Sequence, residues 1–186
     1  MKKNICALVM AAGFSIRYGS DKRFSGKEAL ILRTLKNIIK NFEYIYLVHR
    51  SSDVKLISLL ESLPIILIKA PSEDTCLGTS ISIGFEHIEN TNIKYESCAV
   101  FLADMPFIKS ETIIELQSKQ DLNYIIRPRF DESSGHPVLF GNSFFEELIG
   151  VKGEKGANSI IRKNLNRLKL IDVQDCGVIQ DIDYPE

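Results

Sequence analysis

The sequence predicts an α/β fold in which a mostly parallel β-sheet carries helices on both faces. Short apolar runs rich in Val, Ile and Leu alternate along the chain with segments whose apolar residues recur at helical spacing. Several runs are continuously apolar, which is typical of strands that are buried on both faces of a parallel sheet. No linker, low-complexity tract or internal repeat interrupts the 186 residues, so we expect a single domain over residues 1–186.

The expected elements alternate from the N-terminus onwards. Strands are predicted, from apolar and β-branched content, at residues 5–10, 44–48, 65–68, 98–102, 124–126, 138–140 and 170–173. Helices are predicted, from apolar spacing, at residues 31–42, 54–63, 79–88, around 113–116, 144–149 and 157–165. The run IILI at residues 65–68 is expected to be buried on both faces, and Thr79 or Ser80 is expected to cap the helix at Ile81.

Composition limits the classes of function. The formal net charge is −1, with 45% hydrophobic and 25% charged residues, as in an ordinary soluble globular protein. Nothing therefore indicates a nucleic-acid or membrane surface, and no apolar stretch is as long as a membrane span. The N-terminal apolar run is too short for a secretion signal, so we expect a cytoplasmic protein. Buried reduced thiols are favoured over disulfides or a metal site for the widely spaced Cys6, Cys76, Cys98 and Cys176.

Residues 5–23, ICALVMAAGFSIRYGSDKR, carry the first chemical signal. An apolar run leads into a loop of small residues, and cations and a helical pattern follow. Small side chains let a polyanion approach backbone N–H groups, and the cations can neutralise phosphate charge. The residues concerned are Ala11, Ala12, Gly13, Ser15, Arg17, Lys22 and Arg23. The loop fits neither G-x-G-x-x-G nor Walker A, and an ordinary strand–loop–helix connection with surface cations is the alternative.

The loop AAGFSIRYGSDK resembles the AAG-x-S-x-R-x-G-x-x-K loop of MobA-like NTP transferases, which include molybdenum cofactor cytidylyl- and guanylyltransferases. The resemblance implies a single-domain, Rossmann-like nucleotidyltransferase fold. It also implies that the small residues of the loop, Ala11, Ala12, Gly13 and Ser15, bind nucleotide. Arg17 and Lys22 would then be both nucleotide-binding and catalytic. The segment between Lys22 and Leu30 is several residues shorter than is usual in the family.

A second signal is FLADMPFI at residues 101–108. Asp104 follows an apolar strand, and Pro106 breaks the chain two residues later. A carboxylate in that position suits Mg²⁺, which prefers carboxylate, water and phosphate oxygens, whereas a turn-forming Asp is the alternative. The D-M-P triplet resembles the family's metal motif, which implies that Asp104 is a catalytic residue and a metal ligand.

Two later segments resemble nucleotide- and acceptor-binding segments of the family. CLGTSISIG, at residues 76–84, resembles G-M-G-x-S-L-x-x-G, which implies that Gly78 and Ser80 bind nucleotide, although Cys76 replaces the first glycine. SSGHPVLF resembles the G-H-P-V segment on the acceptor side, which implies that His136 binds the acceptor; a turn histidine is the alternative. GEKGAN departs from the usual G-D-x-G-A-R at Glu154 and Asn158.

The C-terminal QDIDYPE resembles the family's D-I-D-x-P-E, and a solvated acidic tail is the alternative. The resemblance implies that Asp183 is a second metal or substrate ligand, with Asp181 a weaker candidate. The matching segments run in the family's order from residue 5 to the C-terminus, which is a stronger signal than any one motif.

The resemblance implies a Mg²⁺-dependent transfer of NMP from an NTP to a phosphorylated acceptor, with release of pyrophosphate. Molybdopterin or the molybdenum cofactor is the expected acceptor. CTP is favoured over GTP, because guanylyl enzymes usually carry A-G-G where this loop has AAG. The expected partners are thus an NTP, a phosphorylated small molecule and a client molybdoenzyme, with no nucleic acid and no membrane. A sugar- or polyol-phosphate nucleotidyltransferase and a non-catalytic nucleotide- or cofactor-binding maturation factor remain alternatives.

Overall fold

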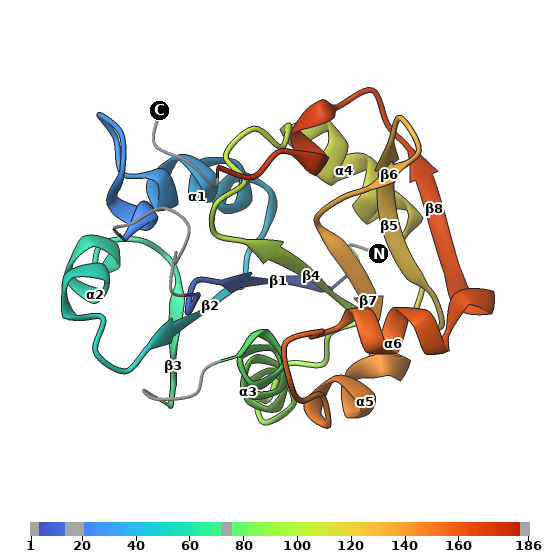
Figure 1. The fold of residues 1–186 in the computed structure, drawn as a ribbon. Coiled ribbons are helices and arrows are strands. Elements are labelled where there is room, and N and C mark those ends of the chain that lie inside the picture. The colour runs from blue at the N-terminus through green and yellow to red at the C-terminus, as the bar shows by residue number, and fades with distance from the viewer. Residues whose placement is uncertain (1–3, 14–20, 72–75, 183–186) are drawn as a thin grey trace.

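The structure, a computed structural model, describes residues 4–13, 21–71 and 76–182. Its centre is an eight-stranded sheet in the order β3-β2-β1-β4-β7-β5-β6, with β8 paired to β5 (Figure 1). The strands are β1 (Ile5–Met10), β2 (Ile45–Arg50), β3 (Ile66–Ala70), β4 (Ser97–Leu102), β5 (Ile125–Phe130), β6 (Ser133–Ser134), β7 (Val138–Gly141) and β8 (Leu168–Asp172). Seven of these strands were expected from apolar runs, and the two-residue β6 was not.

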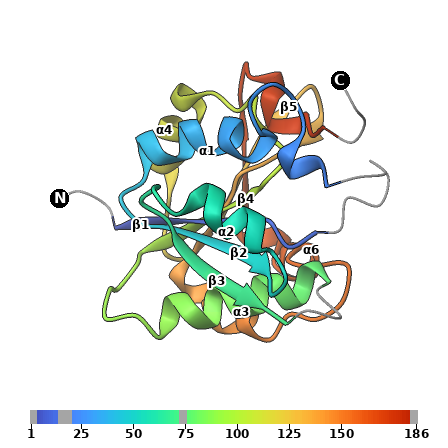
Figure 2. The same ribbon diagram turned by 90° about the vertical axis from the view of Figure 1, so that its left-hand side faces the viewer.

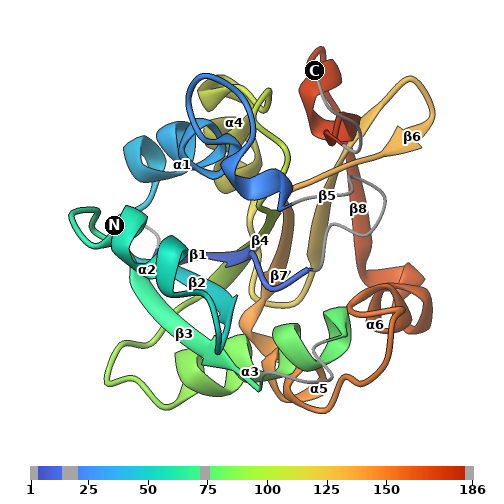
Figure 3. The same ribbon diagram turned by 60° about the vertical axis from the view of Figure 1, so that its left-hand side comes forward.

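Most neighbouring strands are parallel, as the sequence predicts. β1 pairs in parallel with both β2 and β4, and β2 pairs in parallel with β3. β7 is antiparallel to β4 and to β5, so β5 again runs in the direction of β1, and β8 follows it in parallel. The carboxyl ends of six strands therefore share one edge of the sheet. In Figure 3, β8 lies beside β5, and β6 extends from the far end of β5.

Helices cover both faces, because alternate residues of each strand point to opposite sides. One face packs against the apolar sides of α1 (Leu30–Asn41), α2 (Val54–Leu60) and α4 (Ser110–Lys119). The other packs against α3 (Leu77–Glu89), α5 (Phe145–Ile149) and α6 (Asn158–Lys163). Figure 2 shows α1 and α4 above the sheet and α3 below it. This arrangement confirms the predicted fold class.

Four short 3₁₀ helices complete the described elements. They are η2 (Lys22–Phe24), η3 (Asn142–Phe144), η4 (Leu165–Arg167) and η5 (Cys176–Ile179). η5 packs closely against the loop after β4 and against the chain before β7. A Cβ on Gly177 would lie 2.2 Å from the Phe107 carbonyl oxygen, and a Cβ on Gly135 would lie 2.2 Å from the Val178 carbonyl oxygen. The chain that follows η5 is thereby directed back across the carboxyl edge of the sheet.

Two local predictions are wrong. The run at residues 65–68 leads into β3, which is the edge strand of the described sheet, and it is not buried on both faces, since Ile66 is 41% exposed. α3 begins at Leu77, and its N-cap is Cys76 rather than Thr79 or Ser80, because the Cys76 sulfur accepts a hydrogen bond from the Thr79 amide. The first difference comes from strand order, which the local sequence does not encode, whereas the second is a local bond between Cys76 and Thr79.

The four cysteines are free thiols; Cys6 and Cys98 are buried as expected, whereas Cys76 is partly exposed and Cys176 is exposed, contrary to the expectation. None of the helices in the described part of the chain combines the length and the apolarity that a membrane crossing would need.

Candidate functional site

The carboxyl edge of the sheet brings the predicted loops together. Ala11 and Ala12, which leave β1, are buried, and the Ala11 amide donates to the Val48 carbonyl at the end of β2. Gly13 is exposed, and a Cβ there would meet no atom of the described residues within 4 Å. Ser15 and Arg17 lie outside the described residues.

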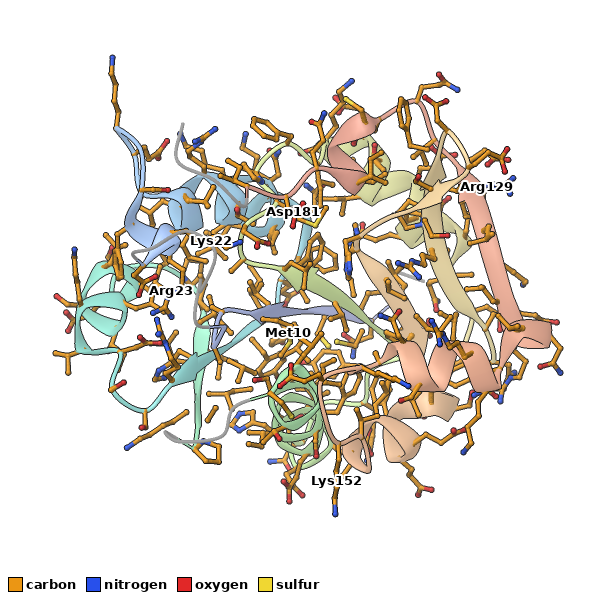
Figure 4. All side chains as sticks on the ribbon, viewed as in Figure 1. Met10, Lys22, Arg23, Arg129, Lys152 and Asp181 are labelled. Atoms are coloured by element: carbon orange, nitrogen blue, oxygen red, sulfur yellow. The ribbon has the colours of Figure 1, made fainter. Side chains whose placement is uncertain are left out.

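Lys22 and Asp104 meet at this edge of the sheet, and Lys22 is labelled in Figure 4. The Lys22 ammonium lies 2.6 Å from Asp104 Oδ2, and their side chains are only 13% and 18% exposed. The chain positions both residues, since Lys22 begins η2 and Asp104 follows β4 directly. The Thr34 hydroxyl of α1 also donates to the Ala103 carbonyl at 2.9 Å and so ties α1 to the end of β4. The pair places one cation and one anion at a half-buried point beside the loop.

Asp104 has an oxygen that suits a hard cation. Its Oδ1 is buried and has no hydrogen-bond partner in the described chain. Within residues 4–13, 21–71 and 76–182, no group of three or more His, Cys, Asp or Glu side chains is arranged to hold a metal ion. The unpartnered Oδ1 of Asp104 fits the type of Mg²⁺ site in which one or two carboxylates act together with water and substrate phosphates.

The C-terminal segment returns to Asp104, as the family resemblance implies. The Ile182 amide donates to the Asp104 carbonyl oxygen at 3.1 Å. Asp181 is exposed, and its carboxylate is close enough to His136 to affect the pKa of the imidazole. Asp183 lies outside the described residues.

Arg23 does not serve as a free cation for phosphate, contrary to the expectation for this loop. It is 4% exposed, and its guanidinium donates to Asp21, to both carboxylate oxygens of Asp53 and to the Ala11 carbonyl. Arg50 also contacts both carboxylates, with 2.8 Å to Asp21 and 3.3 Å to Asp53. This network fixes the end of the loop to the start of α2. Its members are far apart in sequence, so the loop motif alone could not have revealed it.

The start of α3 lies against the loop before α6. A Cβ on Gly78 would come within 2.6 Å of the Gly153 carbonyl oxygen, and the Gly78 amide donates to that oxygen. The close approach that Gly78 permits is thus to the protein's own backbone. Ser80 is buried in the first turn. Hydrogen bonds from the hydroxyl and amide of Thr79 lower the pKa of the Cys76 thiol.

His136 lies two residues before β7 and is joined to Pro137 by a cis peptide bond. Its amide donates to the Val178 carbonyl at 2.8 Å, which ties it to η5. Burial and the charge of Arg127 lower the pKa of His136 to about 4, although the Val100 backbone and Asp181 act in the opposite direction. The imidazole is therefore neutral at physiological pH.

Sequence reasoning missed two residues around this site. Asp175 is buried and accepts hydrogen bonds from the Lys109 amide, the Thr112 hydroxyl and the Gly177 amide, so it joins α4 to η5. Arg127 is a half-buried cation on β5 beside His136. The available signal for Arg127 was its place directly after the apolar residues Ile125 and Ile126 of the strand.

Comparison with known families gives a match over most of the chain. The MobA-like NTP transferase domain matches residues 7–168. No curated protein matches the chain significantly.

Solved structures share the fold. Rv0371c from Mycobacterium tuberculosis H37Rv superposes with a TM-score of 0.84 at 19% identity, covering 99% of this chain and 94% of that one. A nucleotidyl transferase from Methanothermobacter thermautotrophicus gives 0.79 at 14% identity, covering 97% and 92%. A 4-diphosphocytidyl-2C-methyl-D-erythritol synthase from Anaerococcus prevotii gives 0.71 at 17% identity, covering 97% and 91%. Rv0371c has also been solved as a complex with manganese.

Proposed function

Since this chain belongs to the MobA-like NTP transferase domain family, we propose that it transfers NMP from an NTP, with CTP favoured, to a phosphorylated acceptor. The proposed acceptor is molybdopterin or the molybdenum cofactor, and the client would be a molybdoenzyme. The proposed cofactor is Mg²⁺, and the proposed location is the cytoplasm. The observation that carries the proposal is the Lys22–Asp104 pair at the carboxyl edge of the sheet. It joins the two residues for which the sequence motifs imply phosphate and metal binding.

In the proposed reaction an oxygen of the acceptor phosphate attacks the α-phosphorus of the NTP. The bond from that phosphorus to the β-phosphate oxygen breaks, and pyrophosphate leaves with the bond's electrons. A phosphomonoester is already largely ionised at neutral pH, its second pKa being about 6, so no general base is needed. Catalysis would rest on alignment and charge neutralisation.

The chain's own residues have distinct roles in this proposal. Gly13 and its neighbours expose backbone to the triphosphate, while Lys22, with Arg17, neutralises charge on it. Asp104 would be the protein's ligand for Mg²⁺, with Asp183 as a second candidate. Bound Mg²⁺ would neutralise and orient phosphate oxygens. Lys22 already neutralises Asp104, so ligand binding must exchange their 2.6 Å contact for contacts of each with phosphate and metal.

The preference for CTP rests on the AAG form of the loop, because guanylyl enzymes of the family usually carry glycine at the position of Ala12. The Ala12 side chain lies in the apolar core and is 2% exposed. Rv0371c, which shares the fold, has been solved with manganese, and this supports a divalent cation as the cofactor. A 4-diphosphocytidyl-2C-methyl-D-erythritol synthase also shares the fold, at 17% identity. A polyol phosphate therefore remains an alternative acceptor. The non-catalytic maturation factor remains the alternative from another class.

Pyrophosphate release separates these candidates. We would measure it with each of the four NTPs and Mg²⁺, with and without molybdopterin. The proposal expects release with CTP that depends on molybdopterin and exceeds release with GTP. Release only with a polyol or sugar phosphate would favour the alternative acceptor. NTP binding without release for any acceptor would favour the non-catalytic function.

A further inference from the structure

Arg127 is a cation whose hydrogen-bonding capacity is only partly used by the described residues. Its Nε donates to the Gly135 carbonyl at 3.0 Å, and its Nη2 makes a longer contact of 3.3 Å with the Ser134 carbonyl. A guanidinium has five N–H donors, so these two bonds leave three for another partner. Burial lowers the pKa of Arg127, and no carboxylate of the described residues offsets this effect. A half-buried charge without a counterion is costly, which favours an anionic ligand.

The neighbouring strand residue provides an internal comparison. Arg129 lies two residues further along β5 and hence on the same face of the sheet. Its guanidinium is paired with Asp172 through bonds of 2.6 and 3.0 Å. One arginine of this strand therefore has a carboxylate counterion, whereas among the described residues the other is bonded to carbonyl oxygens. Such bonds orient a guanidinium without neutralising its charge.

His136 provides a second unsatisfied group at the same place. Its Nδ1 is buried and makes no hydrogen bond of standard geometry with the described residues. The charge of Arg127 acts on this imidazole. The two side chains come from β5 and from just before β7, which lies beside β4, the strand that ends next to Asp104. The Arg127–His136 pair is thus on the side of Asp104 away from β1 and its loop.

We infer that Arg127, with the His136 imidazole beside it, binds the phosphate monoester of the acceptor. This inference rests on the proposed function, because it takes the loop after β1 as the NTP side of the site. The outward N–H groups of a guanidinium match two phosphate oxygens, and the Ser134 and Gly135 carbonyls fix the plane of the fork. The acceptor would then approach Asp104 from the β5–β7 side and the NTP from the β1 side.

The test uses phenyl phosphate as the probe, at pH 7.5, with binding followed by broadening of its proton NMR signals. Arg127→Gln should weaken binding at least tenfold, whereas Arg129→Gln, which removes the same charge from the same strand, should change it less than twofold. Equal losses in the two variants, or wild-type binding by Arg127→Gln, would overturn the inference. Glutamine retains an N–H donor for Gly135, and the melting temperature reports whether the turn is preserved.

A second variant covers the case in which Arg127→Gln does not fold. Arg127→Lys keeps the charge without the fork, and we expect binding to weaken at least threefold. Unchanged binding by this variant would contradict recognition by the guanidinium.

NTP binding is measured on the same proteins as a melting shift with Mg²⁺-CTP, and Arg127→Gln should match wild type. If wild type shows no NTP shift but probe binding still depends on Arg127, the proposed function fails and the anion site stands. If the NTP shift is present and probe binding is independent of Arg127, this inference fails alone.

Discussion

At the scale of single residues, two kinds of charged residue lie at the carboxyl edge of the sheet: buried ones that stabilise the structure and partly exposed ones that suit ligand binding. Arg23 and Asp53 are buried and hydrogen-bonded to each other, so their charges neutralise each other inside the protein. Lys22 and Asp104 are partly exposed, and one carboxylate oxygen has no partner in the described chain. The distinction matters because Lys22 and Arg23 are adjacent in sequence.

Asp53→Asn should destabilise the protein by about 2–4 kcal/mol, because it leaves the buried Arg23 guanidinium short of a counterion. Denaturant unfolding measures the loss. Glu28→Gln is the matched control, since it removes an exposed carboxylate paired with Lys36 and should cost less than about 0.5 kcal/mol. Similar losses in the two variants would mean that the Arg23–Asp53 pair does not brace the loop.

His136 makes a prediction about pH. Its pKa is lowered to about 4 in the folded protein, against an ordinary value near 6.5 in the unfolded chain. Between these values the unfolded state binds more protons, so the free energy of unfolding should rise with pH from about 4 to 6.5 and then level off. The maximum slope from one group is about 1.4 kcal/mol per pH unit.

We would measure this slope in wild type and in His136→Gln, which does not titrate. The difference in unfolding free energy between the two proteins should vary between pH 4.5 and 6.5 and stay constant above pH 7. A constant difference over the whole range would show that the imidazole is not held neutral by burial.

At the scale of elements, contacts between loops far apart in sequence set the edges of the site. α3 begins against the loop before α6, because Gly78 allows its backbone to meet that of Lys152 and Gly153. η5 joins the loop after β4 to the start of β7, and Asp175 bonds to both α4 and η5. The site is thus assembled from short connections that support one another.

Gly78→Ala should cost about 1–3 kcal/mol, since the new Cβ would lie 2.6 Å from a backbone oxygen and the facing loop must shift. Gly150→Ala is a suitable control, because its nearest atom would be at 3.5 Å and its φ is −81°. Stability of the control should be unchanged or slightly raised. If Gly78→Ala is as stable as the control, α3 does not pack closely on that loop.

At the scale of the whole molecule, the sequence predicted the architecture well, because buried parallel strands are continuous apolar runs that can be recognised locally. It also predicted that Lys22, Asp104 and the C-terminal segment belong to one site, since the motifs occur in the family's order. It could not predict which arginines have carboxylate partners, because Arg23 and Asp53 are 30 residues apart and Arg129 and Asp172 are 43 residues apart. The edge position of β3 likewise depends on strand order.

The most direct test of nucleotidyl transfer is product analysis. Wild type is incubated with CTP, Mg²⁺ and molybdopterin, and the acceptor is analysed by mass spectrometry. Its mass should increase by one CMP unit, with one pyrophosphate released per adduct. Lys22→Ala and Asp104→Asn should lower the rate at least 100-fold, with each variant checked for intact folding by its melting temperature. Absence of an adduct with every NTP and phosphorylated acceptor tried, or wild-type rates in both variants, would contradict the assignment.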